Sequence, residues 1–354
     1  MGFLFNKLLK PLLFNDYQGL PVSGGYPVKE TAAILIDRAR TDPFEKGGSF
    51  REVPVHFYYP EAAVQGAGGC PLVVFSHGAF GFYKSNYSTY AELASNGYVV
   101  AAIDHPHHAI FTKNTIAKRV FVSGAFMRSI REMNGEITAQ RQYERYVDWM
   151  SLRVADMCFA LDRFKAAAQA CAADDSWVFP DKDRAEILSV LKLLDVTKIG
   201  LMGHSMGGAT AVEVGRLRND VSAVIDLDGT MLGEYTGVEQ DTLTVREEAY
   251  PVPVLELCSW DQYNRVKELL AQGESRYPND VLIRNAAAGF TTTIRDTKHG
   301  DFTDLPLVSP FLGKKLGKGA RDTAEAMTIV NSLVREFLNC YLKGEGVFQG
   351  ETLY

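Results

Sequence analysis

The chain has 354 residues, of which 46% are hydrophobic and 23% are charged. This composition is typical of a folded globular protein and excludes disordered and collagen-like classes. The formal net charge of −6 argues against a nucleic-acid binder, which would carry a basic patch. The five cysteines are widely spaced without any C-x-x-C pair, so a disulfide framework is not expected and a cytoplasmic location is predicted.

The first fourteen residues are apolar but are interrupted by Lys7, Lys10 and Pro11. They are too short for a transmembrane helix and lack the small-residue cleavage site of a signal peptide. We expect this segment to pack on the body of the protein, and peripheral membrane contact is the alternative.

Strand and helix patterns alternate along the rest of the chain. Residues 53–59 alternate in polarity around Pro54 and predict an edge strand. Further strands are predicted at 72–76, 98–103, 198–202, 223–227, 252–257 and 291–295. Helices are predicted at 87–96, 152–168 and 207–215, and a closing helix over 322–341 has a capping-box-like start at Asp322 and Glu325. The alternation predicts an α/β fold with a mainly parallel central sheet and helices on both faces.

The sequence G-x-S-x-G runs from Gly203 through Ser205 to Gly207. It directly follows a predicted strand and precedes a small-residue helix, which is the setting of a nucleophile elbow in α/β-hydrolases. Glycines are needed there because the tight turn strains the backbone at Ser205 and leaves no room for a Cβ on either side. The turn exposes the serine hydroxyl above the sheet, so we predict that Ser205 is a nucleophile.

A serine nucleophile needs a base and a carboxylate that orients the base. His299 is the only histidine downstream of Ser205, and it follows the last predicted strand, so we predict that it is the base. Asp228 ends the strand 223–227, and Asp261 follows the next strand. The residues alone leave these two aspartates as equal candidates for the acid, with Asp226 as a supporting polar group.

Backbone N–H groups are expected to form the oxyanion hole. One donor is the N–H of Met206, directly after the nucleophile, and the second should come from the loop 77–81. Four aromatic residues near these motifs are candidates for lining an acyl pocket: Phe80, Phe82, Tyr83 and Trp260.

Cofactors and metals are not expected. The cluster His105-Pro106-His107-His108 has no second ligand cluster at metal-binding spacing. The chain also lacks the G-x-G-x-x-G and Walker-type loops that bind nucleotides.

An ordered set of segments resembles the plasma-type (isoform II) platelet-activating factor acetylhydrolase family and its bacterial members. The segments are DRARTDPF at 37–44, REVPV at 51–55, FSHG at 75–78, LASNGYVVAAIDH at 93–105, RVADM at 153–157, GHSMGG at 203–208 and TKHGDF at 297–302. The resemblance implies an α/β-hydrolase whose acid is Asp228 and whose second oxyanion donor is Ala79, with Phe80 as the alternative donor. Asp261 stays open as the acid because the loop 259–263 departs from the family's usual residues.

The resemblance also implies a serine esterase that acts, without calcium, on phospholipids with short or oxidised acyl groups. A general carboxylesterase, lipase or polyester-type hydrolase is the alternative within enzymes. A catalytically silent α/β-hydrolase that serves as a binding protein is the alternative outside them.

The spacing of the motifs predicts one hydrolase domain over residues 51–345. Residues 1–50 are expected to be an N-terminal extension. An insertion at about 106–151, which fits no strand pattern, is expected to be a lid. Its excess of Lys and Arg residues could also bring it into contact with a membrane surface.

Overall fold

The computed structural model describes residues 17–61, 69–271, 277–309, 311, 313–314, 317–350 and 352–354. The prediction for the first fourteen residues therefore lies outside the described residues. The strands are β1 (Val28–Thr41), β2 (Phe50–Pro60), β3 (Cys70–Ser76), β4 (Val99–Ile103), β5 (Phe111–Lys113), β6 (Arg119–Phe121), β7 (Trp177–Val178), β8 (Leu194–His204), β9 (Ala223–Leu227), β10 (Tyr235–Glu239), β11 (Thr242–Val245), β12 (Val254–Ser259) and β13 (Gly289–Ile294). The helices are α2 (Tyr87–Ser95), α3 (Gly124–Met133), α4 (Ala139–Ala170), α5 (Arg184–Leu193), α6 (Met206–Leu217), α7 (Trp260–Ala271), α8 (Pro278–Asn285), α9 (Leu305–Val308) and α11 (Thr323–Leu338).

The central sheet of the described chain has the strand order β13-β12-β9-β8-β3-β4-β2-β1-β7. The strands from β13 to β4 pair in parallel, whereas β2, β1 and β7 pair antiparallel. The mainly parallel sheet predicted from the alternating pattern is therefore confirmed. Because parallel strands end at one edge, the loops after β3, β8, β9, β12 and β13 meet there.

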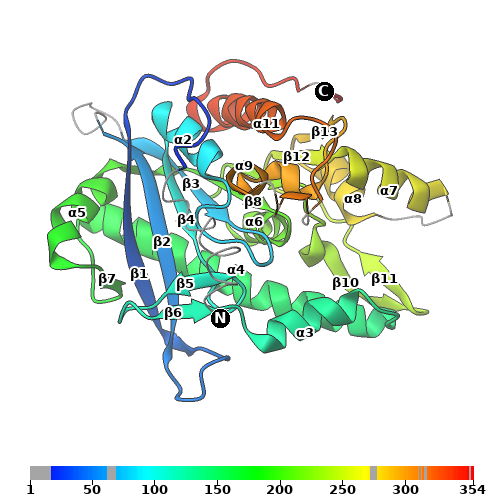
Figure 1. Cartoon of the computed structure of the whole chain (residues 1–354), viewed down its shortest axis with the longest axis horizontal. Coiled ribbons are helices and arrows are strands. Elements are labelled where there is room, and N and C mark those ends of the chain that lie inside the picture. Colours follow the sequence, from blue (N-terminus) through cyan, green and yellow to red (C-terminus); the bar gives the residue numbers. More distant parts are fainter. Residues whose placement is uncertain are drawn as a thin grey trace.

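Each face of the sheet has its own hydrophobic core. Along β3, Leu72 and Val74 pack with residues of α4, α5 and α6, whereas Val73 and Phe75 pack with residues of α2 and α11 (Figure 1). All four side chains are fully buried. Burial on both faces explains why the central strands have continuous apolar sequences.

The prediction that residues 53–59 form an edge strand is wrong, because β2 lies between β4 and β1. Pro54 suggested an edge because it cannot donate a backbone hydrogen bond. Its carbonyl accepts a hydrogen bond from the N–H of Asp104 (2.9 Å), and the paired register with β4 begins only at Val55. The position where Pro54 lacks an N–H therefore lies at the end of the β2–β4 ladder, and no hydrogen bond within that ladder is lost.

Strand β1 lies within the segment 1–50, which we expected to be an extension. It pairs with β2 over almost its whole length, and its burial alternates, with Ala33 and Leu35 in the core. This part of the segment is thus a strand of the central sheet.

The insertion at 106–151 contains the β5–β6 hairpin, α3 and the start of α4, so the expectation that it holds no strand is wrong. Helix α4 contacts both strands of the β10–β11 hairpin, and the Tyr143 hydroxyl donates to the carbonyl of Thr236 (3.1 Å). Glu132 forms ion pairs with Arg141 and Arg145, both at 2.6 Å, so part of the positive charge of the insertion is neutralised within it. Within the described ranges, no helix is both long enough and apolar enough to cross a membrane.

Candidate active site

The turn at Ser205 has the geometry of a nucleophile elbow. Strand β8 ends at His204 and α6 begins at Met206, and Ser205 between them has φ +56° and ψ −126°. A Cβ on Gly203 would lie 2.1 Å from the carbonyl oxygen of Gly207, and a Cβ on Gly207 would lie 2.0 Å from that of Ser76. Any side chain at either glycine would therefore displace the backbone, as the motif predicts.

His299 lies beside the end of β9. It opens a short 3₁₀ turn, His299–Phe302, after β13, and its Nδ1 lies 2.7 Å from Oδ2 of Asp228. The other carboxylate oxygen of Asp228 accepts a hydrogen bond from the Ser259 N–H (2.6 Å). The His299 side chain is 48% exposed and that of Asp228 only 1%, so the imidazole faces the cavity and the carboxylate lies behind it.

The Asp228 carboxylate is held in its charged form. Burial by itself would raise its pKa, but the hydrogen bond and charge of His299 and the hydrogen bonds from Ser259 outweigh burial and lower the pKa below its usual value. Asp228 is therefore ionised at neutral pH and can stabilise a protonated His299.

Asp261, the alternative acid, occupies a different position. It lies in the first turn of α7 with its side chain 66% exposed, and one of its carboxylate oxygens lies 3.9 Å from Lys298 Nζ. It borders the same cavity as His299, but Asp228 makes the hydrogen bond to the imidazole. Asp226 accepts the Gly229 N–H with both oxygens (3.1 and 3.2 Å), so it supports the turn that carries Asp228.

Two backbone N–H groups are available next to Ser205. Met206 is the first residue of α6, so its N–H has no partner inside the helix. In the described part of the chain the Ala79 N–H also has no acceptor, whereas the Phe80 N–H donates to the carbonyl of His108 (3.1 Å). Of the two candidates in the loop after β3, Ala79 therefore has the free donor.

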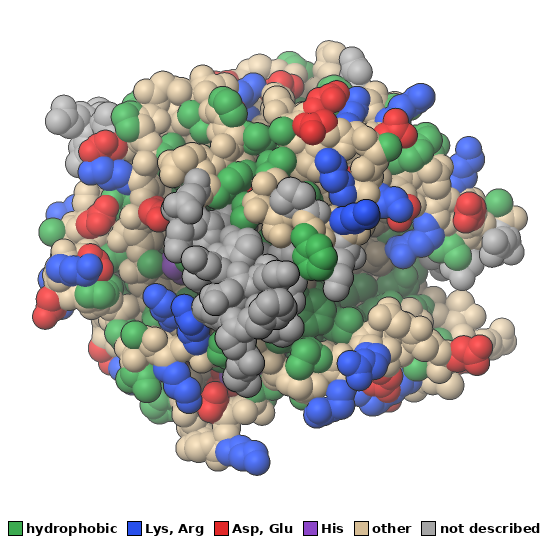
Figure 2. Space-filling model, in the orientation of Figure 1, with side chains coloured by type: hydrophobic (Ala, Val, Ile, Leu, Met, Phe, Trp, Pro, Cys, Tyr) green, Lys and Arg blue, Asp and Glu red, His purple; other side chains and the backbone are tan. Residues whose placement is uncertain are grey.

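Ser205, Asp228 and His299 border one cavity of about 350 Å³. It lies between α3 and α7, where Figure 2 shows a hollow with hydrophobic side chains. The other residues that line it are Ala79, Ile130, Met206, Thr230, Leu232, Ser259, Asp261, Gln262 and Arg265. Sequence reasoning missed six of them: Ile130, Thr230, Leu232, Ser259, Gln262 and Arg265. The one signal for them in the sequence was that Gln262 and Arg265 share a helix with Asp261, and that this helix starts at the edge of the sheet where the site lies.

The four aromatic residues predicted to line an acyl pocket do not line this cavity, because each packs against another ring. Phe80 packs on Phe126 with ring centroids 5.4 Å apart, and Phe82 packs on Phe111 at 5.3 Å. Tyr83 stacks on His56 (3.4 Å), and Trp260 stacks on Tyr263 (5.3 Å).

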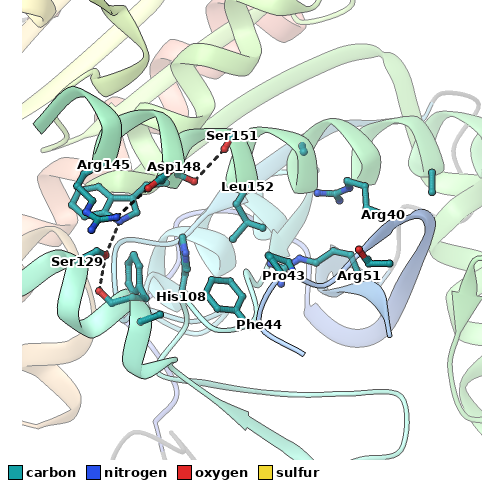
Figure 3. Close-up of a pocket in the computed structure, with 16 residues that line it drawn as sticks. Arg40, Pro43, Phe44, Arg51, His108, Ser129, Arg145, Asp148, Ser151 and Leu152 are labelled. Atoms are coloured by element: carbon teal, nitrogen blue, oxygen red, sulfur yellow. Dashed lines mark hydrogen bonds and ion pairs between the residues drawn. The ribbon is translucent and has the colours of Figure 1, made fainter. Parts of the chain in front are cut away.

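A second cavity, of about 650 Å³, lies between α3, α4 and the β1–β2 loop. Figure 3 shows Leu152 of α4 pointing toward Phe44, with His108 beside them. All three of its arginines are ion-paired. Arg40 pairs with Asp37 and Asp156, Arg51 with Asp42 and Asp156, and Arg145 with Glu132 and Asp148.

The histidines at 105–108 have structural partners. His105 lies 3.0 Å from a carboxylate oxygen of Asp156 and 2.9 Å from the Ser76 hydroxyl, and burial lowers its pKa to about 4. His108 stacks on Phe126 at 3.8 Å. Where the structure describes the chain, no cluster of three or more His, Cys, Asp or Glu residues could hold a metal ion.

Comparisons with known proteins agree with this fold. Residues 54–352 match the family model of platelet-activating factor acetylhydrolase, isoform II. The platelet-activating factor acetylhydrolase of Gallus gallus is 27% identical over 293 residues, which cover 77% of this chain and 62% of the relative. A probable 1-alkyl-2-acetylglycerophosphocholine esterase of Arthroderma benhamiae is 23% identical over 296 residues, covering 80% of this chain and 64% of the relative. The chain thus spans slightly less than two thirds of these relatives.

Among solved structures, the ferulic acid esterase of Streptomyces cinnamoneus is similar, with a TM-score of 0.64 and 20% identity. The match covers 92% of this chain and 93% of that structure. This likeness and the sheet topology confirm the predicted α/β-hydrolase fold. Since the family model matches most of the chain, the chain belongs to the platelet-activating factor acetylhydrolase, isoform II, family, as its motifs predicted.

Proposed function

We propose that the protein is a serine hydrolase that cleaves carboxylic esters through an acyl-enzyme. The observation that carries the proposal is the shared cavity. A serine on a strained elbow, a histidine 2.7 Å from a buried carboxylate, and two free N–H donors all face the same space of about 350 Å³. This combination of nucleophile, base, orienting acid and oxyanion donors is the machinery of acyl transfer.

In the proposed mechanism, Ser205 Oγ attacks the ester carbonyl while His299 Nε2 takes the hydroxyl proton. The Met206 and Ala79 N–H groups bind the oxygen as it becomes negative. His299 then gives its proton to the leaving alkoxide, and the alcohol departs. A water molecule activated by His299 attacks the acyl-enzyme and releases the acid, which regenerates Ser205.

Asp228 has two tasks in this cycle. Its hydrogen bond to Nδ1 keeps the proton of neutral His299 on that nitrogen, so that Nε2 is free to accept. Its negative charge stabilises the imidazolium that forms during each proton transfer.

We propose a short-acyl ester as the substrate, in the form of a phospholipid with a short or oxidised acyl group. The names of the chicken and fungal relatives favour this class. The cavity lies near the lower end of the range for ligand pockets, about 300–1,000 Å³. Its wall is apolar at Ile130 and Leu232 and polar at Gln262 and Arg265, which suits an acyl group on one side and a polar alcohol on the other.

The test is an acyl-length profile of the purified protein on p-nitrophenyl esters, together with a 1-alkyl-2-acetyl-glycerophosphocholine and a long-chain phosphatidylcholine. The proposal predicts the highest kcat/KM for the shortest acyl chains and a clear preference for the acetyl phospholipid. Equal rates on long and short chains would favour a general carboxylesterase or lipase. No turnover of any ester would favour a catalytically silent binding protein.

We propose a cytoplasmic location, as the cysteine pattern predicts. Peripheral contact with lipid surfaces through the N-terminal segment or the insertion is the alternative to a segment packed on the body, and a vesicle co-sedimentation assay separates the two.

A further inference from the structure

Arg153 lies on α4 behind the loop that carries Ala79, and its side chain is fully buried. Its Nη1 donates to the carbonyl of His77 (2.6 Å), and Nη2 lies 3.4 Å from the carbonyl of Gly78. Its Nε donates to Nδ1 of His108 (3.3 Å). All five N–H donors of an arginine lie in one rigid plane. Arg153 therefore holds the loop at the carbonyls of His77 and Gly78 while it also binds His108.

The Gly78 carbonyl matters because it belongs to the same peptide unit as the Ala79 N–H. A trans peptide is planar, with its C=O and N–H pointing in opposite directions. Donors that hold the Gly78 carbonyl therefore also fix the direction of the Ala79 N–H, and Ala79 borders the same cavity as Ser205. Besides Arg153, these donors are Gly81 N–H (3.0 Å) and His77 Nδ1 (2.7 Å).

The loop needs such support because a glycine rotates easily at its own dihedral angles. A Cβ at Gly78 would lie 2.8 Å from His204 Nδ1 and 3.2 Å from the Cβ of Ser205, so the position next to the nucleophile must remain glycine. Because the elbow requires glycine at position 78, the Gly78–Ala79 peptide can rotate unless other groups fix it.

His108 connects Arg153 to the other end of the loop. It accepts from Arg153 with its ring, and its backbone carbonyl accepts the Phe80 N–H (3.1 Å). The same imidazole borders the second cavity (Figure 3). The peptides on both sides of Ala79 are therefore tied to one guanidinium.

A fully buried arginine without a direct carboxylate partner is costly. No ion pair to Arg153 occurs among the residues that the structure describes. Asp156, three residues further along α4, is bound instead to Arg40, Arg51 and His105. The guanidinium instead donates to two carbonyls of the active-site loop and to the imidazole of His108, which indicates that positioning the loop is its role.

Accordingly, we infer that Arg153 is a positioning residue that holds the Gly78–Ala79 peptide with its N–H facing the oxyanion. The inference rests on the proposed esterase function and deepens it by assigning a residue that orients the second oxyanion donor.

The experiment compares steady-state ester hydrolysis by the parent, Arg153→Met and Arg153→Lys. Loss of one oxyanion donor costs about 100- to 1,000-fold in kcat. Two other donors still hold the Gly78 carbonyl, so we expect a smaller loss in Arg153→Met, about 10- to 100-fold in kcat with little change in KM. Arg153→Lys keeps one charged donor, and we expect it to recover part of the loss.

A second measurement separates positioning from general loosening. A trifluoromethyl ketone forms an oxyanion on Ser205, so its inhibition constant should rise in Arg153→Met by about the same factor as kcat/KM falls. The matched control is Arg51→Met, another fully buried arginine of the same polar cluster that contacts Asp42, Asp156 and the Pro106 carbonyl but not the loop. Arg51→Met should lower the melting temperature and leave kcat unchanged.

Three results would overturn the inference in an active parent. They are a folded Arg153→Met with unchanged kcat, a kcat loss in Arg51→Met as large as that in Arg153→Met, and an inhibition constant that stays constant while kcat falls. If Arg153→Met does not fold, the same criteria apply to Arg153→Lys. A parent that hydrolyses no ester would overturn the proposed function itself, and the two failures are thus distinguishable.

Discussion

Replacing Asp228 by Asn removes one charge and leaves the shape of the site unchanged. Asp228 has φ +56°, a left-handed conformation that Asn adopts more readily than most residues. The variant should therefore fold, and its effect on the reaction should come from the lost carboxylate.

The magnitude follows from the two donors that meet Asp228, the Ser259 N–H at 2.6 Å and His299 Nδ1 at 2.7 Å. An amide has only one acceptor oxygen, so one of these donors must face the NH₂ group. If the NH₂ faced the buried Ser259 N–H, two unsatisfied donors would cost about 1–3 kcal/mol each. The amide oxygen therefore stays on Ser259, and the NH₂ faces His299.

His299 then adopts the tautomer with its proton on Nε2, and Nε2 can no longer accept the proton of Ser205. A wrong tautomer of this kind costs about 10⁴-fold in kcat, which corresponds to about 5.4 kcal/mol of transition-state stabilisation. We expect a loss of this order in Asp228→Asn, with KM changed by less than about threefold.

The assay is steady-state hydrolysis of p-nitrophenyl acetate by the parent, Asp228→Asn and Asp261→Asn, with circular dichroism as a check on folding. Asp261 is the matched control, because it borders the same cavity but is exposed and, among the described residues, pairs with Lys298 at 3.9 Å. Its variant should stay within about threefold of the parent. The reasoning is refuted if Asp261→Asn loses more activity than Asp228→Asn.

Three further predictions concern stability, the elbow and the cavity. Burial raises the pKa of Glu256 to about 7 from an unfolded value of 4.5, so its stabilising effect is complete below pH 4.5 and is lost as pH rises to about 7, by up to about 3 kcal/mol. Urea unfolding at pH 5 and pH 8 should show this loss in the parent and a smaller one in Glu256→Gln; an identical loss in both would contradict the assignment. Gly207→Ala places a Cβ 2.0 Å from the Ser76 carbonyl oxygen and should lower both the melting temperature and activity, whereas Gly25→Ala, which meets nothing within 4 Å, should be neutral in both. Ile130→Trp narrows the cavity and should reduce kcat/KM more for hexanoyl than for acetyl esters; an equal reduction would show that Ile130 does not border the acyl group.

Short-range patterns explain why much of the fold and several candidate site residues could be predicted from the sequence. Gly203, Ser205 and Gly207 are neighbours in the chain, and their strand–turn–helix setting is local. The buried strands were recognisable because burial on both faces makes them continuously apolar. His299 needed no pattern at all, because it is the only histidine after Ser205.

The features that were left open or predicted wrongly depend on tertiary contacts. Asp228 and Asp261 both follow strands, and only the conformation after each strand separates them. Asp228 itself is left-handed and its carboxylate meets His299, whereas Asp261 lies in the first turn of a helix. The aromatic residues after β3 were misplaced because their partners, Phe111 and Phe126, come from the distant insertion. The prediction that β2 is an edge strand was wrong because β1 pairs with it on the side away from β4.

The most direct test of the account is labelling by a fluorophosphonate probe, which phosphonylates an activated serine. The parent should incorporate one probe per chain and lose its ester hydrolysis in parallel, and Ser205→Ala should neither label nor hydrolyse esters. A Ser205→Ala variant that labels and turns over esters like the parent would contradict the assignment of Ser205 as the nucleophile.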